Sequence, residues 1–210
     1  MTTRVILASR SPQRLALLQL LVSHSVIEVR PPRSPDEAGF AGLHDLSSIR
    51  QRLMEIARGK AADVWEQMSE DALSPIIIAA DTVIVVEEAA GRSLVLGQPP
   101  SDETWPDIVR GWFRDYYAGR THRALTALVL RSGDQAPIER VVETEVMMRP
   151  DVEPLLEWYL STGEPRGKAG GYAIQGAGSV FVIRLSGSLS NVVGLPLEAL
   201  REALEECSGT

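Results

Sequence analysis

Ser9, Ser11 and Arg14 bring two hydroxyl groups and a guanidinium together in the segment LASRSPQR, residues 7–14. The apolar run over residues 4–8 predicts a short buried strand, and Ser11 followed by proline is typical of a helix N-terminus. The free N–H groups and the dipole of such a helix end favour an anion. The segment therefore predicts an anion site; the alternative is that Ser11 is only a cap and Arg14 only a surface charge.

Asp81 directly follows an apolar run over residues 75–80 that predicts a buried strand. A carboxylate in that place is costly unless it is paired, bound to a metal or placed at the exposed end of the strand. The C-terminal end of a central strand is where open α/β sheets bind their ligands, and a carboxylate there can ligate Mg²⁺ or orient a water. The alternative is an aspartate in an ordinary turn at the end of the strand.

Only two of the 21 basic residues are lysines, Lys60 and Lys168. Apolar residues recur with helical spacing over residues 46–68, and Lys60 lies at the edge of that stripe. It can direct a compact charge at phosphate, or it can extend to solvent without a function. Because the chain uses arginine almost everywhere else, the two lysines indicate places that need an ammonium group.

A glycine-rich segment, GKAGGYAIQG, occupies residues 167–176 and contains Lys168 and Gln175. Glycines allow a close approach between backbone and ligand. The amide of Gln175 both donates and accepts hydrogen bonds, which suits the edge of a nucleobase. The alternative is an ordinary flexible loop, since glycine content alone carries little information.

The charge distribution supports a local anion site. The 210 residues carry a formal net charge of −7, yet residues 1–60 hold nine basic and five acidic side chains. An acidic chain argues against broad binding to a nucleic-acid backbone, which needs a basic footprint. A basic N-terminal third on an acidic protein indicates one anion site, with chance clustering as the alternative.

Cysteine, histidine and hydropathy exclude several other classes. One cysteine, Cys207, cannot form an internal disulfide, and the three histidines His24, His44 and His122 have no metal-ligand spacing. We find no signal-peptide pattern, and the apolar stretches are far shorter than the roughly 20 residues of a membrane span. We therefore expect a soluble, cytoplasmic protein that binds neither nucleic acid nor membrane.

Helical and strand-like segments alternate along the chain, with hairpins among them. This order predicts an α/β fold, a mixed twisted sheet with helices on both faces, built as one domain over residues 1–210. Two lobes around a cleft are the alternative arrangement. The predicted strands are residues 4–8, 26–30, 76–80 continued by 83–86, 93–96, 120–131, 138–149, 180–185 and 190–193; the predicted helices are 12–22, 46–68, 106–117, 151–160 and 196–206.

Five segments in this order resemble signatures of the Maf family, nucleoside triphosphate pyrophosphatases also known as septum-formation inhibitors. They are LASRSPQR at residues 7–14, ADTV at 80–83, GRTH at 119–122 followed by Leu125-Thr126, GKAGGYAIQG at 167–176 and SNVVGLP at 190–196. The resemblance implies a deep central cleft in a fold related to inosine triphosphatases. It also implies hydrolysis of a nucleoside triphosphate to the monophosphate and pyrophosphate, with a divalent metal ion, Mg²⁺ or Mn²⁺.

Matched by position, Asp81 resembles the family's proton acceptor and metal ligand. Glu37 is the best match to a second acidic metal ligand, with Asp36 as the alternative. The resemblance implies substrate-binding roles for the other matched positions. These are Ser9, Ser11, Arg14 and Lys60 for the phosphates, Gln13, Thr82 and Gln175 for the choice of base, and Lys168 in the glycine-rich loop.

The pairing of ADT with GKAGGYAIQG is similar to the family branch that acts on dTTP, UTP and some modified pyrimidine nucleotides. Two positions depart from that pattern. Gln13 stands where the branch commonly has arginine, and Gln98 stands where the family has a lysine. A hydrogen bond to a charged group contributes about 1.5–3 kcal/mol, so we expect weaker binding or an altered base preference.

Two other functions compete with the hydrolase. A non-catalytic nucleotide-binding regulator of cell division would bind nucleotide without turnover. A nucleotidyltransferase would release pyrophosphate only with a second acceptor substrate. Base rates for such enzymes predict a homodimer.

Overall fold

The computed structural model describes the chain except for residues 1–3, 23–25, 34–38, 69–74, 134 and 209–210. Its strands are β1 (Arg4–Leu7), β2 (Val26–Val29), β3 (Ile76–Glu87), β4 (Ser93–Leu96), β5 (Thr121–Ser132), β6 (Ile138–Met148) and β7 (Val182–Ser186). Its helices are α1 (Pro12–Leu21), α2 (Leu46–Glu66), α3 (Trp105–Trp112), α4 (Glu153–Ser161), α5 (Leu189–Val193) and α6 (Leu197–Ser208). Short helical turns are η1 (Ala89–Gly91), η2 (Phe113–Tyr117), η3 (Ala169–Gly171) and η4 (Ala177–Phe181).

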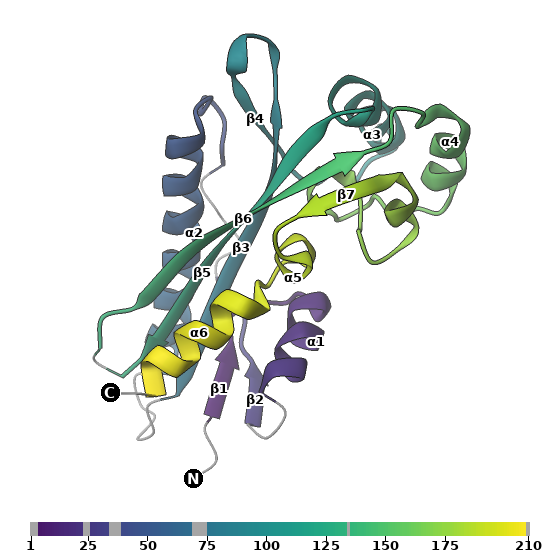
Figure 1. The fold of residues 1–210 in the computed structure, drawn as a ribbon. Coiled ribbons are helices and arrows are strands. Elements are labelled where there is room, and N and C mark those ends of the chain that lie inside the picture. Colours follow the sequence, from purple (N-terminus) through teal and green to yellow (C-terminus); the bar gives the residue numbers. More distant parts are fainter. Residues whose placement is uncertain (1–3, 23–25, 34–38, 69–74, 134, 209–210) are drawn as a thin grey trace.

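All the strands belong to one mixed sheet with the order β2-β1-β3-β5-β6-β7, as Figure 1 shows. Strands β2, β1 and β3 are parallel, whereas β3, β5, β6 and β7 run antiparallel to their neighbours. The short fourth strand forms a hairpin with the end of β3. This confirms the predicted mixed sheet.

Strand β3 has two different neighbours along one side, and they do not meet. Strand β1 pairs with residues 76–78 and β4 with residues 84–87. On the other side, β5 pairs with residues 76–85. Among the described strands, none pairs with residues 79–83 on the side of β1 and β4. We call this stretch the β3 gap; it contains Asp81 and Thr82.

Side chains of β3 alternate between two faces, and helices cover both of them. Ile77, Ala79, Val83 and Val85 pack in one core cluster with α2, and Asp81 shares their parity. On the other face, Ala80 belongs to a cluster with α1 and α6, whereas residues further along β3 pack with α3, η2 and α4. Thr82 lies between these two clusters, which places the β3 gap at a boundary in the core.

Three sequence predictions need correction. Asp81 does not end a strand, because β3 continues as a single strand to Glu87, paired with β5 over residues 76–85 and with β4 over residues 84–87. Residues 190–193 form part of helix α5, where Ser188 caps the N-terminus and Gly194, at φ 125°, ends it. A segment of only four residues cannot distinguish a helical turn from a strand. The strand predicted from residue 180 begins at Val182, after η4.

The predicted long helices are present, with ends set by local capping. Ser11 caps α1 with a proline at the first position, and Asp45 caps α2 by accepting a hydrogen bond from the Ser48 amide. Within the described residues, no helix combines the length and the apolar character that crossing a membrane would require.

Candidate active site

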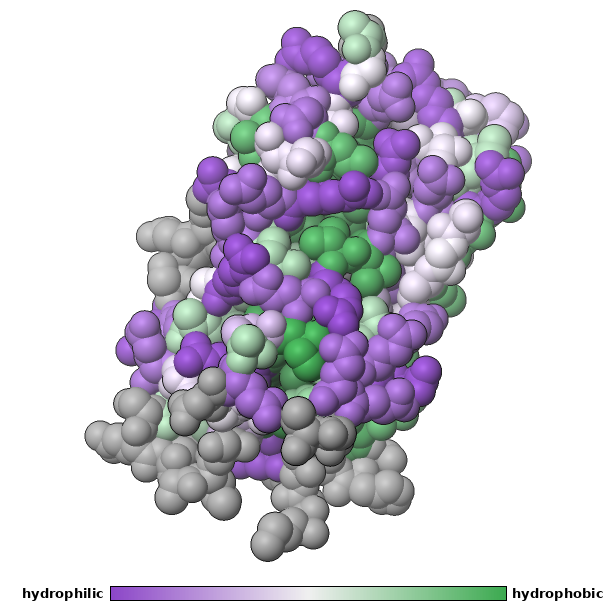
Figure 2. Space-filling model, turned by 60° about the vertical axis from the view of Figure 1, so that its left-hand side comes forward, coloured by the Kyte–Doolittle hydropathy of each residue, from purple (hydrophilic) through white to green (hydrophobic). Residues whose placement is uncertain are grey.

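A cleft of about 920 Å³ opens at the β3 gap. Figure 2 shows hydrophilic side chains around a hollow in this face, with hydrophobic ones between them. Its lining carries five basic and two acidic side chains, in a protein with a net charge of −7. The cleft is therefore locally positive, as an anion site requires.

Every predicted site residue within the described part of the chain lines this one cleft. The set comprises Ser9, Ser11, Gln13, Arg14, Lys60, Asp81, Thr82, Lys168 and Gln175. Glu37 and its alternative Asp36 lie outside the described residues, so their placement stays a prediction. Long-range folding thus brings together residues from four segments of the chain.

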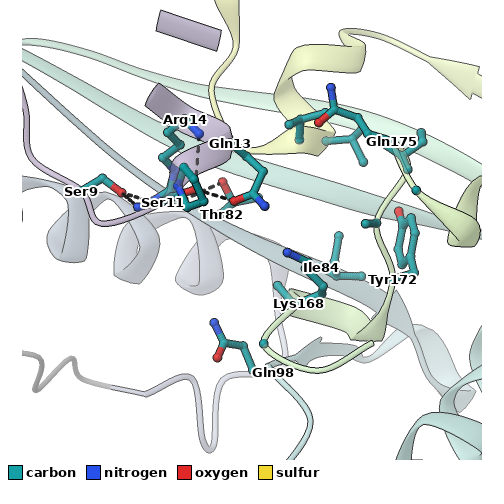
Figure 3. Close-up of a pocket in the computed structure, with 18 of the residues that line it drawn as sticks. Ser9, Ser11, Gln13, Arg14, Thr82, Ile84, Gln98, Lys168, Tyr172 and Gln175 are labelled. Atoms are coloured by element: carbon teal, nitrogen blue, oxygen red, sulfur yellow. Dashed lines mark hydrogen bonds between the residues drawn. The ribbon is translucent and has the colours of Figure 1, made fainter. Parts of the chain in front are cut away.

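The polar wall of the cleft, as we call it, consists of Ser9, Ser11, Arg14, Lys60 and Asp81. Ser11 caps α1: its hydroxyl accepts the Arg14 amide at 3.3 Å, and its own amide donates to the Ser9 hydroxyl at 3.1 Å. These hydrogen bonds hold the two hydroxyls close together between the end of β1 and the start of α1, as Figure 3 shows. This geometry suits an anion at the start of α1.

Arg14 connects three elements through its guanidinium. Nε donates to the Gly194 carbonyl at 2.8 Å, Nη1 to the Ser9 hydroxyl at 3.3 Å and Nη2 to the Thr82 hydroxyl at 3.2 Å. The guanidinium is therefore held at the junction of α1, β3 and the turn after α5. A planar fork held in this way is pre-oriented for phosphate.

Lys60 and Asp81 form an ion pair inside the cleft. Lys60 Nζ lies 2.6 Å from Asp81 Oδ1, and each side chain is 14% exposed. The two side chains meet because side chains alternate between the two faces along β3. This alternation directs Asp81 to the face that α2 covers. Both residues were predicted from the sequence as site residues. Their contact was not, because the two residues are 21 positions apart and it depends on how α2 packs on β3.

The loop wall, our name for residues 164–178, faces the polar wall. Lys168, Tyr172 and Gln175 line the cleft from this loop (Figure 3). Glu164 closes the loop: its carboxylate accepts the Ala177 amide at 2.6 Å and the Gly178 amide at 2.8 Å. The loop is thus an ordered wall and not the ordinary flexible loop of the alternative prediction.

Packing fixes the loop wall from behind. Gly170, at φ 70°, fits so tightly that an added Cβ would lie 2.5 Å from the Tyr117 hydroxyl and 2.8 Å from Ile84 Cγ1. Its amide donates to the Gly97 carbonyl at 2.9 Å, and its carbonyl accepts the Tyr117 hydroxyl at 2.8 Å. Only glycine suits this position, for both backbone angle and space.

His122 belongs to this packing and not to the polar wall. Its Nε2 lies 2.7 Å from the buried hydroxyl of Tyr172, and burial lowers the pKa of the imidazole to about 3. Burial also raises the pKa of the Tyr172 hydroxyl. Both groups are therefore neutral at physiological pH and act by holding the ring of Tyr172 against the cleft.

Gln13 and Gln98, the two departures from the family pattern, both line the cleft. Gln13 accepts a hydrogen bond from the Ser11 hydroxyl at 3.1 Å through its side-chain oxygen. Gln13 and Gln98 carry no charge. The rim of the cleft is still positive, because the exposed residues Arg10 and Arg166 line it.

Within the described part of the chain, the cleft offers one carboxylate for a metal ion. Among the described residues, no three His, Cys, Asp or Glu side chains cluster as metal ligands. Of the two acidic residues that line the cleft, Glu164 is engaged with backbone amides, which leaves Asp81. Mg²⁺ is often bound by one or two carboxylates plus substrate phosphates, so the oxygen donors of Asp81 fit such an ion.

Sequence reasoning missed several residues that support the site. Thr126 and Asn191 are fully buried polar residues behind Arg14, and Tyr172 and Glu164 shape the loop wall. Thr126 interrupts an apolar run over residues 124–130, and both Thr126 and Asn191 lie in segments that resemble the family signatures, which was the available signal.

The two ends of the cleft differ chemically. The polar wall gathers hydroxyls, cations and a carboxylate, whereas Ile84, Tyr172, Ile174 and Val192 line the part next to the loop wall. One part of the cleft can therefore hold a polyanion, and the other can hold a flat, partly apolar group with Gln175 to read its edge.

Comparisons with known proteins place the chain among described families. The family described as Maf-like protein matches residues 4–207. A dTTP/UTP pyrophosphatase of Anaeromyxobacter sp. is 37% identical over 209 residues, covering 97% of this chain and 89% of that protein. A protein of the same name from Caldicellulosiruptor bescii is 34% identical, covering 97% of this chain and 94% of its own length.

A solved structure, that of a HAM1 protein from Coxiella burnetii, aligns with a TM-score of 0.47 at 16% identity. The alignment covers 98% of this chain and 100% of that one.

Proposed function

The chain belongs to the Maf family, and from this premise we propose that it is a nucleoside triphosphate pyrophosphatase that hydrolyses dTTP and UTP. The observation that carries the proposal is the Lys60–Asp81 pair at the β3 gap, inside a cleft with five basic side chains. The curated relatives named dTTP/UTP pyrophosphatase support the choice of substrate.

The triphosphate lies against the polar wall. Ser9 and Ser11 donate hydroxyl hydrogen bonds at the start of α1, while Arg14 and Lys60 neutralise the phosphate charge. Because hydroxyls and cations converge from different elements, they fix the chain of phosphates in one direction across the cleft. The α-phosphorus is thereby placed near Asp81.

Asp81 acts as the general base. One of its oxygens is engaged by Lys60, and the other orients a water molecule for attack on the α-phosphorus. The new bond joins the water oxygen to the α-phosphorus, and the bond to the oxygen that bridges the β-phosphorus breaks. The proton of the water passes to Asp81, and pyrophosphate leaves with the bridging oxygen.

The reaction is expected to depend on a divalent cation, Mg²⁺ or Mn²⁺. Asp81 would hold it, with Glu37 as the predicted second ligand. Such an ion, when bound, supplies charge neutralisation for the phosphate oxygens. The residues of the chain still bind, orient and accept the proton as described.

The base lies toward the loop wall. Tyr172 and Ile84 offer apolar contact, and Gln175 offers both a donor and an acceptor to a pyrimidine edge. Gln13 and Thr82 are the other positions that the resemblance connects with base choice. We expect dTTP and UTP to be preferred over ITP and 7-methyl-GTP.

A nucleotide panel with Mg²⁺ and Mn²⁺ tests the function, with pyrophosphate release as the readout. We expect release from dTTP and UTP without any acceptor substrate. Binding without turnover at either metal would favour the regulator, and release only with an added acceptor would favour the nucleotidyltransferase. A preference for ITP or 7-methyl-GTP would overturn the assigned base.

The variant Asp81→Asn tests the mechanism, because it keeps the shape and removes the base. We expect a loss of activity of about 10²–10⁴-fold, the usual contribution of a general base. Asp107→Asn is the matched control, since Asp107 lies on α3 with its side chain 82% exposed, and it should retain activity. A loss of less than about tenfold in Asp81→Asn would remove Asp81 from the catalytic role.

A further inference from the structure

We propose that Thr126, a buried residue behind the cleft, is a positioning residue that holds the Arg14 guanidinium by way of Thr82. The inference rests on the proposed function, in which Arg14 binds phosphate. Among the hydrogen bonds of the described residues, Thr126 meets the cleft lining only at Thr82. Its role is to fix where the hydroxyl of Thr82, and with it Arg14, can lie.

The two threonines sit at a boundary in the core. Thr82 on β3 is directly opposite Thr126 on β5 in the register of the antiparallel pair. On the same face, their neighbours two residues away are apolar and belong to different clusters: Ala80 and Leu128 on one side, Ile84 and Ala124 on the other. Thr126 is 0% exposed, so its hydroxyl is costly unless hydrogen-bonded.

The hydrogen bonds behind Arg14 form one connected chain. Arg14 Nη2 donates to the Thr82 hydroxyl at 3.2 Å. The Thr82 and Thr126 hydroxyls lie 2.9 Å apart, a contact that either of them can donate, and Thr82 also lies 3.5 Å from the Gly194 carbonyl. The Thr126 hydroxyl reaches the Asn191 carbonyl at 3.2 Å. The chain thus runs from the guanidinium through two hydroxyls to a backbone carbonyl.

The same turn anchors Arg14 a second time. Arg14 Nε donates directly to the Gly194 carbonyl at 2.8 Å, and the Gly194 amide donates to the Asn191 carbonyl at 3.0 Å. Asn191 is itself fixed, because its side-chain amide donates to the Ala124 carbonyl and the Thr144 hydroxyl, each at 3.0 Å. The direct bond and the relay form a closed ring that leaves the guanidinium one orientation.

This ring also defines the surroundings of Thr82. Its hydroxyl already lies within hydrogen-bond distance of Arg14 Nη2, the Thr126 hydroxyl and the Gly194 carbonyl. We therefore expect its influence on the substrate to pass through Arg14 and the phosphates, while Gln175 contacts the base.

Thr126→Val tests the proposal, since valine keeps the shape and removes the hydroxyl. We expect kcat/KM for dTTP to fall about tenfold, mainly through KM, as for the loss of a hydrogen bond that orients a charged group. Thr126→Ser should restore kcat/KM to within about twofold of wild type, because serine keeps the relay.

The control is Ser93→Ala. Ser93 is another buried residue with a hydroxyl; it lies on β4 and belongs neither to the cleft lining nor to the ring around Arg14. We expect it to leave kcat/KM within about twofold of wild type. Equal losses of kcat/KM in Thr126→Val and Ser93→Ala would mean a general structural effect and would overturn the proposal.

A double-mutant cycle separates positioning from stability. In an Arg14→Ala background, Thr126→Val should change kcat/KM by less than about twofold, because the group it positions is gone. If the two losses multiply as independent effects, Thr126 does not act through Arg14 and the proposal fails.

A readout that needs no turnover keeps this test separate from the proposed function. The Arg14 Nη2–H resonance, from the group that donates to Thr82, should be protected from solvent exchange in the wild type and in Thr126→Ser, and should broaden in Thr126→Val. An unchanged resonance in Thr126→Val would overturn the positioning role. Absence of pyrophosphate release from the wild-type protein would overturn the proposed function and leave this test intact.

Discussion

The two walls of the cleft are built on different principles. The polar wall is held by hydrogen bonds between side chains, such as those of Arg14 to Ser9 and Thr82. The loop wall is held by packing, with Gly170 against Tyr117 and Tyr172 against His122. Hydrogen bonds can exchange partners with a substrate at little net cost, whereas packed atoms cannot move apart without leaving a void.

The difference teaches which wall binds charge and which one sets shape. A charged substrate can bind the hydroxyls and cations of the polar wall without displacing packed atoms, so single losses there should be small for folding and large for activity. The loop wall should behave in the opposite way, because its buried residues, such as Gly170 and Tyr172, are tightly packed.

Among substitutions that test this difference between the two walls, Gly170→Ala should have the largest effect on the free energy of unfolding. The added methyl would collide with Tyr117 and Ile84, and φ 70° is strained for alanine. We expect a loss of about 3 kcal/mol in the free energy of unfolding, measured in urea. Gly167→Ala is the matched control: the same φ of 70° with no atom within 4 Å should cost about 1 kcal/mol. Equal losses would show that strain, and not packing, governs the loop wall.

Acidification should weaken the loop wall through His122. Its pKa is about 3 in the folded protein and 6.5 when unperturbed, so the unfolded chain takes up the proton first. The contribution of His122 to the free energy of unfolding is complete above about pH 6.5. It is lost as the pH falls below that value, at about 1.4 kcal/mol per pH unit.

His122→Gln isolates this contribution, since glutamine can still bond to Tyr172 but does not titrate. Between pH 6.5 and about pH 5, where carboxylates contribute little, the wild type should lose about 2 kcal/mol more than the variant. Parallel stability curves over that interval would show that His122 is not buried as a neutral group.

Ser11→Ala should have the smallest effect and sharpens the comparison from the other wall. Losing the cap of α1 should lower the free energy of unfolding by about 1 kcal/mol, and Ser11→Gly by only a few tenths. Urea unfolding of both variants measures the difference. A loss for Ser11→Ala as large as that for Gly170→Ala would abolish the distinction between the two walls.

The sequence predicted what local chemistry decides. Ser11 and the proline after it indicate a helix start, and the two long β-rich runs of β5 and β6 indicate an antiparallel pair. Nine residues that line the cleft could be named, some because polar groups stand in unusual places and others, such as Gln13 and Thr82, through the resemblance to the family. Glu37 stays a prediction.

What the sequence could not predict depends on partners distant in the chain. Asp81 was expected at a strand end, but β3 continues past it because β5 pairs with residues 76–85 and β4 with residues 84–87. The ion pair with Lys60 depends on how α2 crosses the sheet. The hydroxyl of Thr126 had no predictable partner until the fold placed the Asn191 carbonyl beside it.

The β3 gap has a consequence for how this protein avoids aggregation. The Ile78 carbonyl bonds to the Ala8 amide, and because backbone groups alternate in direction, those of Ala80 and Thr82 point into the gap. An open row of backbone donors and acceptors normally invites another chain to add a strand. Here the row is only five residues long and lies between β1 and β4, so it offers little length for a foreign strand to pair with.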